Sequence, residues 1–279
     1  MKGLAGQHWP VPDWHFKRIE SEMACPDPKE QMMAVVARMP SEAAPEIEPI
    51  DWEAALEPYR GLEFPKYYLQ PFHSVPGGYL SESAAMGDRQ AMQAIYAEAH
   101  PRKCLGIRDD IAAQIPESAR RVVDLGGGTG DGGAAVARLR PEASVLSIDA
   151  SPFMVEVGRR QNADLANLEI VQGFAEDTGL EDDSVDAVMI TLVLHECPDF
   201  AKEAIGREAV RILKPGGTLV LTDVPNDDLH RYRGFFEPYK EPWLEFDFEA
   251  FLLGLGLVDP RAADPIERLW TRVATLPAV

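Results

Sequence analysis

Residues 122–130 read Val-Val-Asp-Leu-Gly-Gly-Gly-Thr-Gly, and this stretch decides the fold class. Its first half is short, apolar and rich in β-branched residues, which predicts a buried strand. The glycines permit the positive φ values of a sharp turn and leave room for a ligand beside the backbone. Residues 134–139 then have the pattern of a helix whose amino end, with its free amides and positive dipole, faces that turn. The stretch therefore predicts a cofactor cradle at the end of a strand.

Strand and helix patterns alternate from about residue 120 onward. Strands are expected at 144–148, 168–171, 185–193, 218–222, 257–260 and 268–275, and helices at 152–162, 200–213 and 248–255. Ser151 and Pro152 are suited to cap and begin the first of these helices. Such alternation predicts a doubly wound α/β sheet of mostly parallel strands, whose ligands bind beyond the carboxyl ends of the strands.

The first hundred residues differ in style, because they are rich in Pro, Trp, Tyr and Met. Helical periodicity is present at residues 28–39, 52–59 and 83–100, and residues 40–49 have the composition of an extended linker. We therefore predict a mainly helical N-terminal cap that recognises the substrate over residues 1–110, followed by a Rossmann-like domain over residues 111–279. The apolar cap is also the region expected to pack across a two-fold axis if the chain forms a homodimer.

Composition excludes several classes of protein. The chain has 279 residues, with 46 acidic against 27 basic side chains and a net charge of -19, so a nucleic-acid partner is not expected. A small molecule, neutral or cationic, fits this charge better. Neither an apolar run long enough to span a membrane nor a secretion signal is present. The three cysteines are far apart and lack metal-ligand spacing, which argues against a metal site or disulfides and predicts a cytoplasmic protein.

Two classes of cofactor are compatible with the glycine turn by itself. Residues 128–133 match the pattern G-x-G-x-x-G, and Asp149 follows about twenty residues later, where an acid would hold ribose hydroxyls. This pattern suits a nicotinamide dinucleotide as well as other adenosine ligands. An NAD(P)-dependent oxidoreductase and a catalytically silent cofactor-binding protein are therefore alternatives at this point.

The surrounding residues favour one of these readings, because the chain resembles the class I S-adenosylmethionine-dependent methyltransferases. Five segments carry the resemblance, in family order: residues 122–130, 148–149, 173–177, 185–196 and 213–219, the last containing Lys-Pro-Gly-Gly before a strand. The resemblance implies a Rossmann-like sheet of seven strands, one of them antiparallel near the end. It also implies S-adenosylmethionine as cofactor and methyl transfer by in-line displacement to a small-molecule acceptor.

The resemblance assigns the first cofactor roles to residues of the turn and its two strands. Gly126, Gly128 and Gly130 would let the turn approach the methionine part of the cofactor. Asp124 would neutralise the ammonium group, directly or through water. Asp149 would accept hydrogen bonds from both ribose hydroxyls.

The adenine side of the site is assigned in the same way. Ala175 would offer its backbone amide to the adenine, with Glu176 nearby, and Thr191 would lie beneath the cofactor. Phe174 departs from the family, since many members carry an acid there that binds the adenine amino group. Phe174 would stack on the adenine ring or pack in the core. Met154 would cover the other face of the adenine or be a core residue.

His195 is the candidate catalytic base. Methyl transfer from a sulfonium requires mainly that the nucleophile be positioned and water excluded. A base is needed only when the nucleophile must lose a proton, and histidine suits that task near neutral pH. Glu196 would orient His195 or face solvent; alternatively, His195 is a structural residue that packs against the cap. Oxygen, nitrogen, sulfur and carbon acceptors are all compatible with the sequence.

The acceptor itself is expected to meet residues outside the strands. Tyr67, Tyr68, His73 and Tyr79 would line an aromatic pocket, whose faces attract cations such as a sulfonium, or would fasten the cap to the sheet.

A second candidate for substrate binding follows the strand expected at residues 218–222. Arg231 and Arg233 stand out in an acidic chain. They would bind a carboxylate of the substrate or pair with the nearby Asp227 and Asp228.

Overall fold

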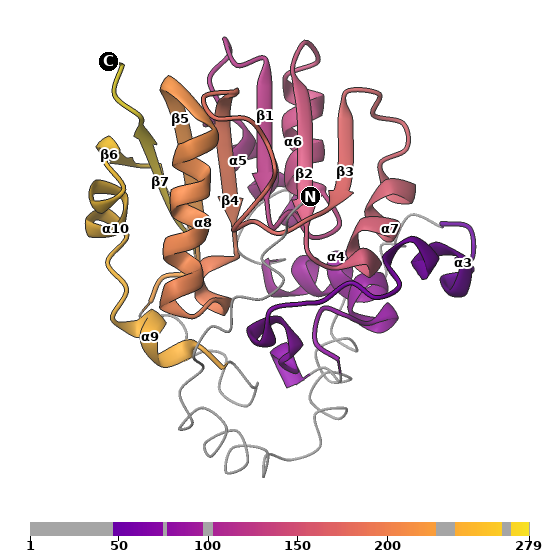
Figure 1. Cartoon of the computed structure of the whole chain (residues 1–279). Helices are drawn as coiled ribbons and strands as arrows, with labels where there is room; N and C mark the ends of the chain where they lie inside the picture. Colours follow the sequence, from indigo (N-terminus) through magenta and orange to yellow (C-terminus); the bar gives the residue numbers. More distant parts are fainter. Residues whose placement is uncertain (1–46, 75–76, 97–102, 227–237, 264–268, 279) are drawn as a thin grey trace.

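A seven-stranded sheet forms the centre of the molecule (Figure 1). The computed structural model describes residues 47–74, 77–96, 103–226, 238–263 and 269–278. The strands are β1 (Arg121–Leu125), β2 (Ser144–Asp149), β3 (Leu168–Gln172), β4 (Val185–Thr191), β5 (Leu213–Asp223), β6 (Val258–Ala262) and β7 (Trp270–Thr275). Their order is β3-β2-β1-β4-β5-β7-β6. Within this order, the strands β3, β2, β1, β4 and β5 each pair with the next in parallel. β7 is antiparallel to both of its neighbours, β5 and β6. The predicted α/β sheet, with its antiparallel strand near the end, is confirmed.

One strand begins earlier than the sequence predicts. The Lys-Pro-Gly-Gly segment was expected to be a turn before a strand at residue 218, yet β5 already begins at Leu213, which pairs with Val185 of β4. Residues 214–217 then bulge before pairing resumes between Ala187 and Thr218. Gly216 supplies the positive φ of 82° that this bulge needs.

Helices cover both faces of the sheet. They are α5 (Lys103–Ala112), α6 (Asp131–Leu139), α7 (Pro152–Gln161), α8 (Asp199–Ile212), α9 (Lys240–Leu244) and α10 (Phe248–Gly254), with a 3-10 turn η4 (Leu194–Glu196) after β4. α8 and α10 lie on one face, and α5 and α6 on the other (Figure 1). The Ser151 side chain caps α7 by accepting a hydrogen bond from the Met154 amide, as predicted. α5 and α9 were not predicted from the sequence.

The N-terminal segment lies across the carboxyl edge of the parallel strands (Figure 1). It contains α3 (Trp52–Leu56), η1 (Glu57–Tyr59), η2 (Lys66–Leu69), η3 (Phe72–Ser74) and α4 (Glu82–Tyr96). α4 packs against α5 and α7, and an ion pair joins Arg89 of α4 to Asp131 at the start of α6. The helix predicted at residues 28–39 lies outside the described residues. The boundary predicted between residues 110 and 111 falls within α5 and stays a prediction.

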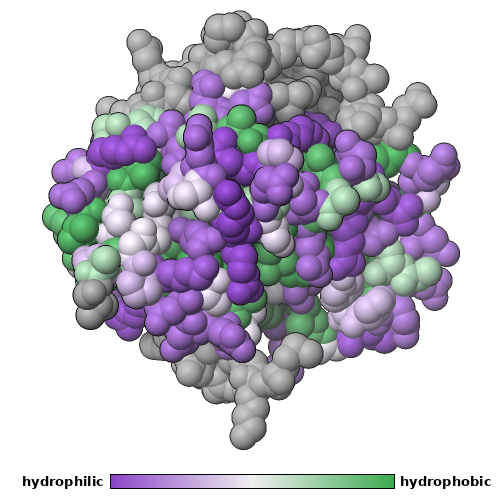
Figure 2. All heavy atoms as spheres, turned by 90° about the horizontal axis from the view of Figure 1, so that it is seen from above, coloured by the Kyte–Doolittle hydropathy of each residue, from purple (hydrophilic) through white to green (hydrophobic). Residues whose placement is uncertain are grey.

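The core consists of the sheet and the helix faces packed on it. Val123, Val188 and Leu219 are among the buried residues of the central strands. A parallel sheet covered on both faces favours such continuous apolar runs. At the amino ends of the strands, polar and charged side chains occupy most of the surface, with apolar residues between them (Figure 2). Among the described residues, none of the helices has the length and apolar character needed to cross a membrane.

Candidate active site

The glycine turn after β1 is packed too tightly for side chains. Gly126 has a φ of 70°, and a Cβ atom there would lie 2.5 Å from Cγ2 of Val193. A Cβ atom on Gly127 would lie 1.9 Å from Oγ of Ser147. Gly126, Gly127 and Gly128 all line a cavity at the carboxyl edge of the sheet. The turn therefore brings bare backbone to the wall of this cavity, as the sequence predicts.

The amides of the turn serve a different purpose from the one expected. The Gly126 and Gly127 amides donate to the carbonyl oxygen of Ile148, at 2.8 and 3.1 Å. The Gly128 amide donates to Oδ2 of Asp149, at 2.8 Å. These bonds hold the turn against the end of β2, so these three amides are already used within the protein. The turn offers room for a ligand, and most polar contacts must come from side chains around it.

Three carboxyl groups, of which Asp124 is buried and Asp88 and Asp149 are partly buried, line the turn side of the cavity. Burial raises the pKa of Asp88, Asp124 and Asp149 to about 6 each. Bonds from the Ser151 and Gly128 amides offset part of this effect at Asp149. At neutral pH these groups are mostly ionised, and the Arg108 cation in the same wall offsets only part of their negative charge. The cavity wall is thus suited to a ligand that carries positive charge.

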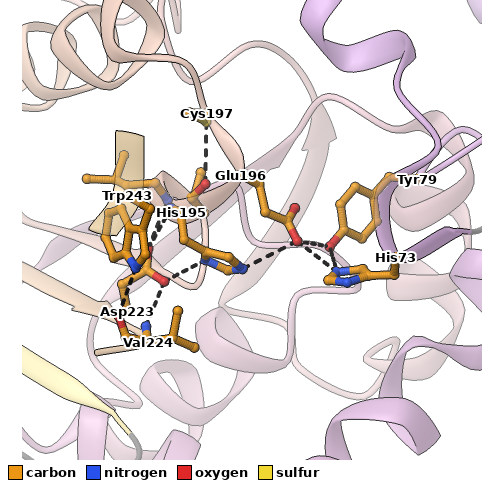
Figure 3. A network of polar contacts seen from close by, with 10 residues as sticks. His73, Tyr79, His195, Glu196, Cys197, Asp223, Val224 and Trp243 are labelled. Atoms are coloured by element: carbon orange, nitrogen blue, oxygen red, sulfur yellow. Dashed lines mark hydrogen bonds and ion pairs between the residues drawn. The ribbon is translucent and has the colours of Figure 1, made fainter. Parts of the chain in front are cut away.

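A histidine that lines the same cavity is held by hydrogen bonds, which Figure 3 shows from close by. Nδ1 of His195, in η4, is 2.6 Å from Oδ1 of Asp223 at the end of β5. Asp223 is fully buried and also accepts bonds from the backbone amides of Leu194, His195 and Val224. These amides fix the carboxylate in place. Asp223 therefore sets the orientation of the imidazole and keeps a proton on Nδ1.

Glu196 joins this histidine to the N-terminal segment (Figure 3). Its Oε1 atom lies 3.4 Å from Nε2 of His195 and 2.8 Å from Nε2 of His73. The Tyr79 hydroxyl donates to the same oxygen at 2.6 Å. A single carboxylate oxygen thus meets three polar groups that come from η3, η4 and the segment before α4.

The carboxylates determine the charge of His195. Burial lowers the pKa of His195, but Asp223 and Glu196 outweigh burial and raise it to about 10. Burial likewise raises the pKa of Glu196, whereas His73 and His195 outweigh it and hold that pKa well below its usual range. In the ligand-free protein at neutral pH, His195 is therefore an imidazolium and Glu196 a carboxylate.

The cavity brings together most of the residues singled out in the sequence. Its wall contains Tyr67, Tyr68, His73, Tyr79, Asp124, Gly126, Gly128, Asp149, Met154, Thr191 and His195. The hydroxyl oxygen of Thr191 is buried there, and it has no hydrogen-bond partner among the described residues. Arg231 and Arg233 lie outside the described residues. Among those described, no group of His, Cys, Asp or Glu is placed to hold a metal ion.

Four predicted cofactor residues lie outside the wall of this cavity. Gly130 precedes α6, where a Cβ atom would lie 2.5 Å from Cδ1 of Ile170. The Phe174 ring packs edge-on against Tyr68, with 6.0 Å between the ring centres.

The next two of these residues differ in exposure, because Ala175 is buried and Glu176 is partly buried. Glu176 accepts a hydrogen bond from the Tyr67 hydroxyl. Burial raises the pKa of Glu176. This region therefore connects to the cavity through Tyr67 and Tyr68.

Sequence reasoning missed several charged residues of the site, among them Asp223, Asp88 and Arg108. Asp223 ends β5 just as Asp149 ends β2, so the rule that ligands bind at the carboxyl ends of strands could have found it. Asp88 of α4 and Arg108 of α5 also line the cavity. Asp88 accepts a hydrogen bond from the Thr129 hydroxyl at 3.1 Å. No local pattern distinguishes either residue from other charged residues on helices.

Comparisons with known proteins agree with this geometry. Residues 122–217 match a family described as a methyltransferase domain. A demethylmenaquinone methyltransferase of Listeria welshimeri is 33% identical over 126 residues, which cover 44% of this chain and 52% of the relative. One from Clavibacter sepedonicus is 35% identical over 127 residues, covering 46% and 50%. The chain thus spans about half the length of the curated relatives it matches.

Two solved structures share the fold. Human N-acetylserotonin methyltransferase, solved in complex with S-adenosylmethionine, has a TM-score of 0.58 and 16% identity, covering 80% of this chain and 62% of that one. An O-methyltransferase family protein from Burkholderia thailandensis has a TM-score of 0.51 and 22% identity, covering 72% and 64%.

The donor set of the cavity also fits the cofactor of this fold. S-adenosylmethionine carries a sulfonium and an ammonium group, which the carboxylates of the wall would match, and the glycine turn lines the same cavity. The unpartnered Thr191 hydroxyl adds a polar contact in the same wall. Residues 122–217 therefore match a methyltransferase domain, on a fold that solved methyltransferases share, and the lining of the cavity fits S-adenosylmethionine.

Proposed function

We propose that this protein transfers a methyl group from S-adenosylmethionine to a small-molecule acceptor that must lose a proton, with His195 as the general base. The observation that carries the proposal is the position of His195 in the wall of the cavity that also contains the glycine turn. Its hydrogen bond to the buried Asp223 supports the role, because such a carboxylate stabilises the imidazolium that proton transfer creates.

The turn side of the cavity would hold the cofactor. Gly126 and Gly128 would leave room for its methionine part, and Asp124 would neutralise the ammonium group. Asp149 would accept hydrogen bonds from the ribose hydroxyls, since its oxygens each retain a second lone pair. When bound, the cofactor supplies an electrophilic methyl group on a sulfonium. Met154 and Thr191 would complete the wall around it.

Adenine binding by residues 174–176 remains part of the proposal. Phe174 lies beside Tyr68 of the cavity wall, and Glu176 bonds to Tyr67 of the same wall. Tyr67 and Tyr68 therefore connect residues 174–176 to the cavity in which the adenine would bind. Gly130 would act indirectly, by allowing the turn to enter α6.

The chemistry of the histidine favours an acceptor with a removable proton. A thioether or tertiary amine has no proton to lose and needs no base, whereas a hydroxyl or an activated ring carbon does. The rings of Tyr67, Tyr68, Phe72 and Tyr79 line the cavity and suit a planar acceptor. The name of the relatives, demethylmenaquinone methyltransferase, supports the same choice. We therefore propose a hydroxylated aromatic ring, such as a reduced quinone, as the acceptor class.

His195 must release its own proton before it can accept another. With a pKa of about 10, its neutral fraction below that pH increases roughly tenfold for each pH unit. The rate of methyl transfer should therefore rise with pH through the neutral range. A pH profile of kcat/KM with its acid limb well above the ordinary pKa of histidine would support His195 as the base.

Methyl-labelled S-adenosylmethionine provides the test. The protein is incubated with reduced quinones, catechols, thioethers and amines, and methylated products are identified by mass. Transfer to hydroxylated rings that is lost in His195→Gln supports the proposal. Transfer only to thioethers or amines, with an unchanged rate in His195→Gln, contradicts it. Turnover of a nicotinamide dinucleotide without methyl transfer would contradict it as well.

A further inference from the structure

We infer that His73 is a positioning residue that, by sharing the Glu196 carboxylate, makes His195 release its proton more easily. The inference deepens the proposed function and rests on it, because it concerns the proposed base. It gives the N-terminal segment an electrostatic role in addition to lining the cavity. His73 and Tyr79 both belong to that segment, and Glu196 follows His195 in η4.

The geometry places three polar groups in competition for one oxygen atom. Oε1 of Glu196 accepts a hydrogen bond from the Tyr79 hydroxyl at 2.6 Å and lies 2.8 Å from Nε2 of His73. Nε2 of His195 is more distant from this oxygen, at 3.4 Å. The closer pair therefore makes the stronger contacts, and His195 is left with the longest of the three. The side chains of Glu196 and His195 are each 10% exposed, so solvent screens the contact between them little, whereas His73 is 33% exposed.

The effect on His195 has the same sign in both forms of His73 that carry a proton on Nε2, the atom that lies 2.8 Å from both Oε1 of Glu196 and the Tyr79 hydroxyl. A neutral His73 with its proton on Nε2 donates to Glu196 and weakens the pull of that carboxylate on His195. A protonated His73 does the same and also repels the imidazolium of His195. The described ionisable groups around His195 and Glu196 are Asp223 of β5, Cys197 after η4, and His73 and Tyr79 of the N-terminal segment. Removing His73 leaves both carboxylates acting on His195.

The backbone conformation of His73 also supports a specific role for this residue. His73 has φ 54° and ψ 26°, a left-handed conformation that costs free energy for a residue with a side chain. The preceding residue, Phe72, is buried and stacks on Tyr79, with 5.5 Å between the ring centres. The segment thus holds the His73 ring at Glu196, next to Tyr79 (Figure 3).

A matched pair of variants tests the inference. His73→Asn tolerates the left-handed backbone but is too short to reach Glu196, whereas His73→Gln keeps the length and an N–H donor. The titration of His195 is followed by NMR of labelled histidine in the ligand-free protein, with its signal identified by loss in His195→Gln. We expect His73→Asn to raise the titration midpoint of His195 by about one pH unit, and His73→Gln to raise it less.

Turnover gives a second and separate readout. The acid limb of kcat/KM should move to higher pH by the same amount, so that the rate near neutral pH falls roughly tenfold while cofactor affinity is unchanged. Tyr79→Phe, which keeps the ring and removes the other donor, should move both measurements in the same direction. It also serves as the test if His73→Asn does not fold.

The outcomes separate this inference from the proposed function. An unchanged midpoint of His195 in both His73→Asn and Tyr79→Phe would overturn the inference, as would an equal loss of rate at every pH. If the midpoint shifts but no acceptor is methylated, the proposed function fails and the electrostatic role of His73 stands. The NMR titration needs neither cofactor nor acceptor, so it tests His73 directly.

Discussion

The two sides of the cavity are built in contrasting ways. The turn side comes mainly from one continuous stretch, residues 122–149, in which the glycine turn bonds to the end of the next strand, and Asp88 of α4 is added to it by packing. The histidine side joins His73, Glu196 and Asp223, which come from three distant parts of the chain. The first side is held mainly by backbone hydrogen bonds and the second mainly by side chains. We infer that the turn side determines cofactor binding and the histidine side determines the acceptor and the pH range.

Replacing His195 should produce the largest effect. Because its imidazole is the proposed base, His195→Gln should lower kcat by about 100-fold or more with a hydroxylated acceptor. Cofactor affinity, measured by isothermal titration, should be unchanged if the two sides act separately. A variant with a nearly wild-type rate would remove His195 from the mechanism, and a large loss of cofactor affinity would break the contrast between the sides.

A pair of glycine variants tests the turn side. Gly126 and Gly179 both have a positive φ, 70° and 68°, but only Gly126 has atoms in the way of a Cβ. Gly179→Ala should cost about 1–2 kcal/mol of unfolding free energy from backbone strain alone. Gly126→Ala should cost about 1–3 kcal/mol more through the clash with Val193. Chemical denaturation measures both variants.

Cofactor titration completes this comparison. Gly126→Ala should weaken binding of S-adenosylmethionine, whereas Gly179→Ala should leave it unchanged, since Gly179 does not line the cavity. Equal losses of stability in the two variants would show that the close approach of Val193 is unimportant.

The carboxyl groups of the turn side predict a smaller, pH-dependent effect. Asp88, Asp124 and Asp149 have pKa values raised to about 6, so acidification neutralises them within the experimental range. A cationic ligand prefers the ionised forms, and its affinity should therefore fall as pH falls. For one such group the loss between pH 7 and pH 5 is roughly tenfold. Titration in buffers of different ionisation enthalpy should also reveal proton release on binding near pH 6; binding independent of pH would contradict this account.

Thr191→Val should give the smallest change, raising the stability of the ligand-free protein but lowering the stabilisation that the cofactor confers. The buried hydroxyl has no partner among the described residues, so replacing it with a methyl group should stabilise the ligand-free protein by about 1 kcal/mol. The same change should reduce the additional thermal stability that S-adenosylmethionine confers. Thermal unfolding with and without the cofactor measures both effects. Destabilisation of the ligand-free protein would indicate a different role for this hydroxyl.

The sequence predicts most of the sheet because its strands are short apolar runs bounded by clear turn residues. The strands at 144–148 and 168–171 each extend one residue further in the structure. The early start of β5 escaped prediction because a bulge containing proline and glycines has no strand pattern. α5 was missed because its charged residues show no distinct periodicity.

The two sides of the site differ in the same respect. Asp149 and the turn glycines are recognisable because their spacing lies within one strand-turn-helix-strand unit. The contact between His73 and Glu196 depends on how the N-terminal segment crosses the carboxyl edge of the sheet, which no local pattern encodes. Asp88 and Arg108 enter the cavity for the same reason, as residues of helices packed on one another. Local patterns therefore locate the glycine turn and Asp149, whereas long-range packing adds Asp88 to the turn side and builds the histidine side.

Isothermal titration of S-adenosylmethionine into the wild-type protein and Asp149→Asn tests the central claim most directly. We predict saturable binding of one molecule per chain to the wild type. Asp149→Asn preserves the size of the side chain but loses charge-assisted hydrogen bonds, so its affinity should be weaker by about tenfold or more. Absence of binding to the wild type, or equal affinity in the two proteins, would contradict the account.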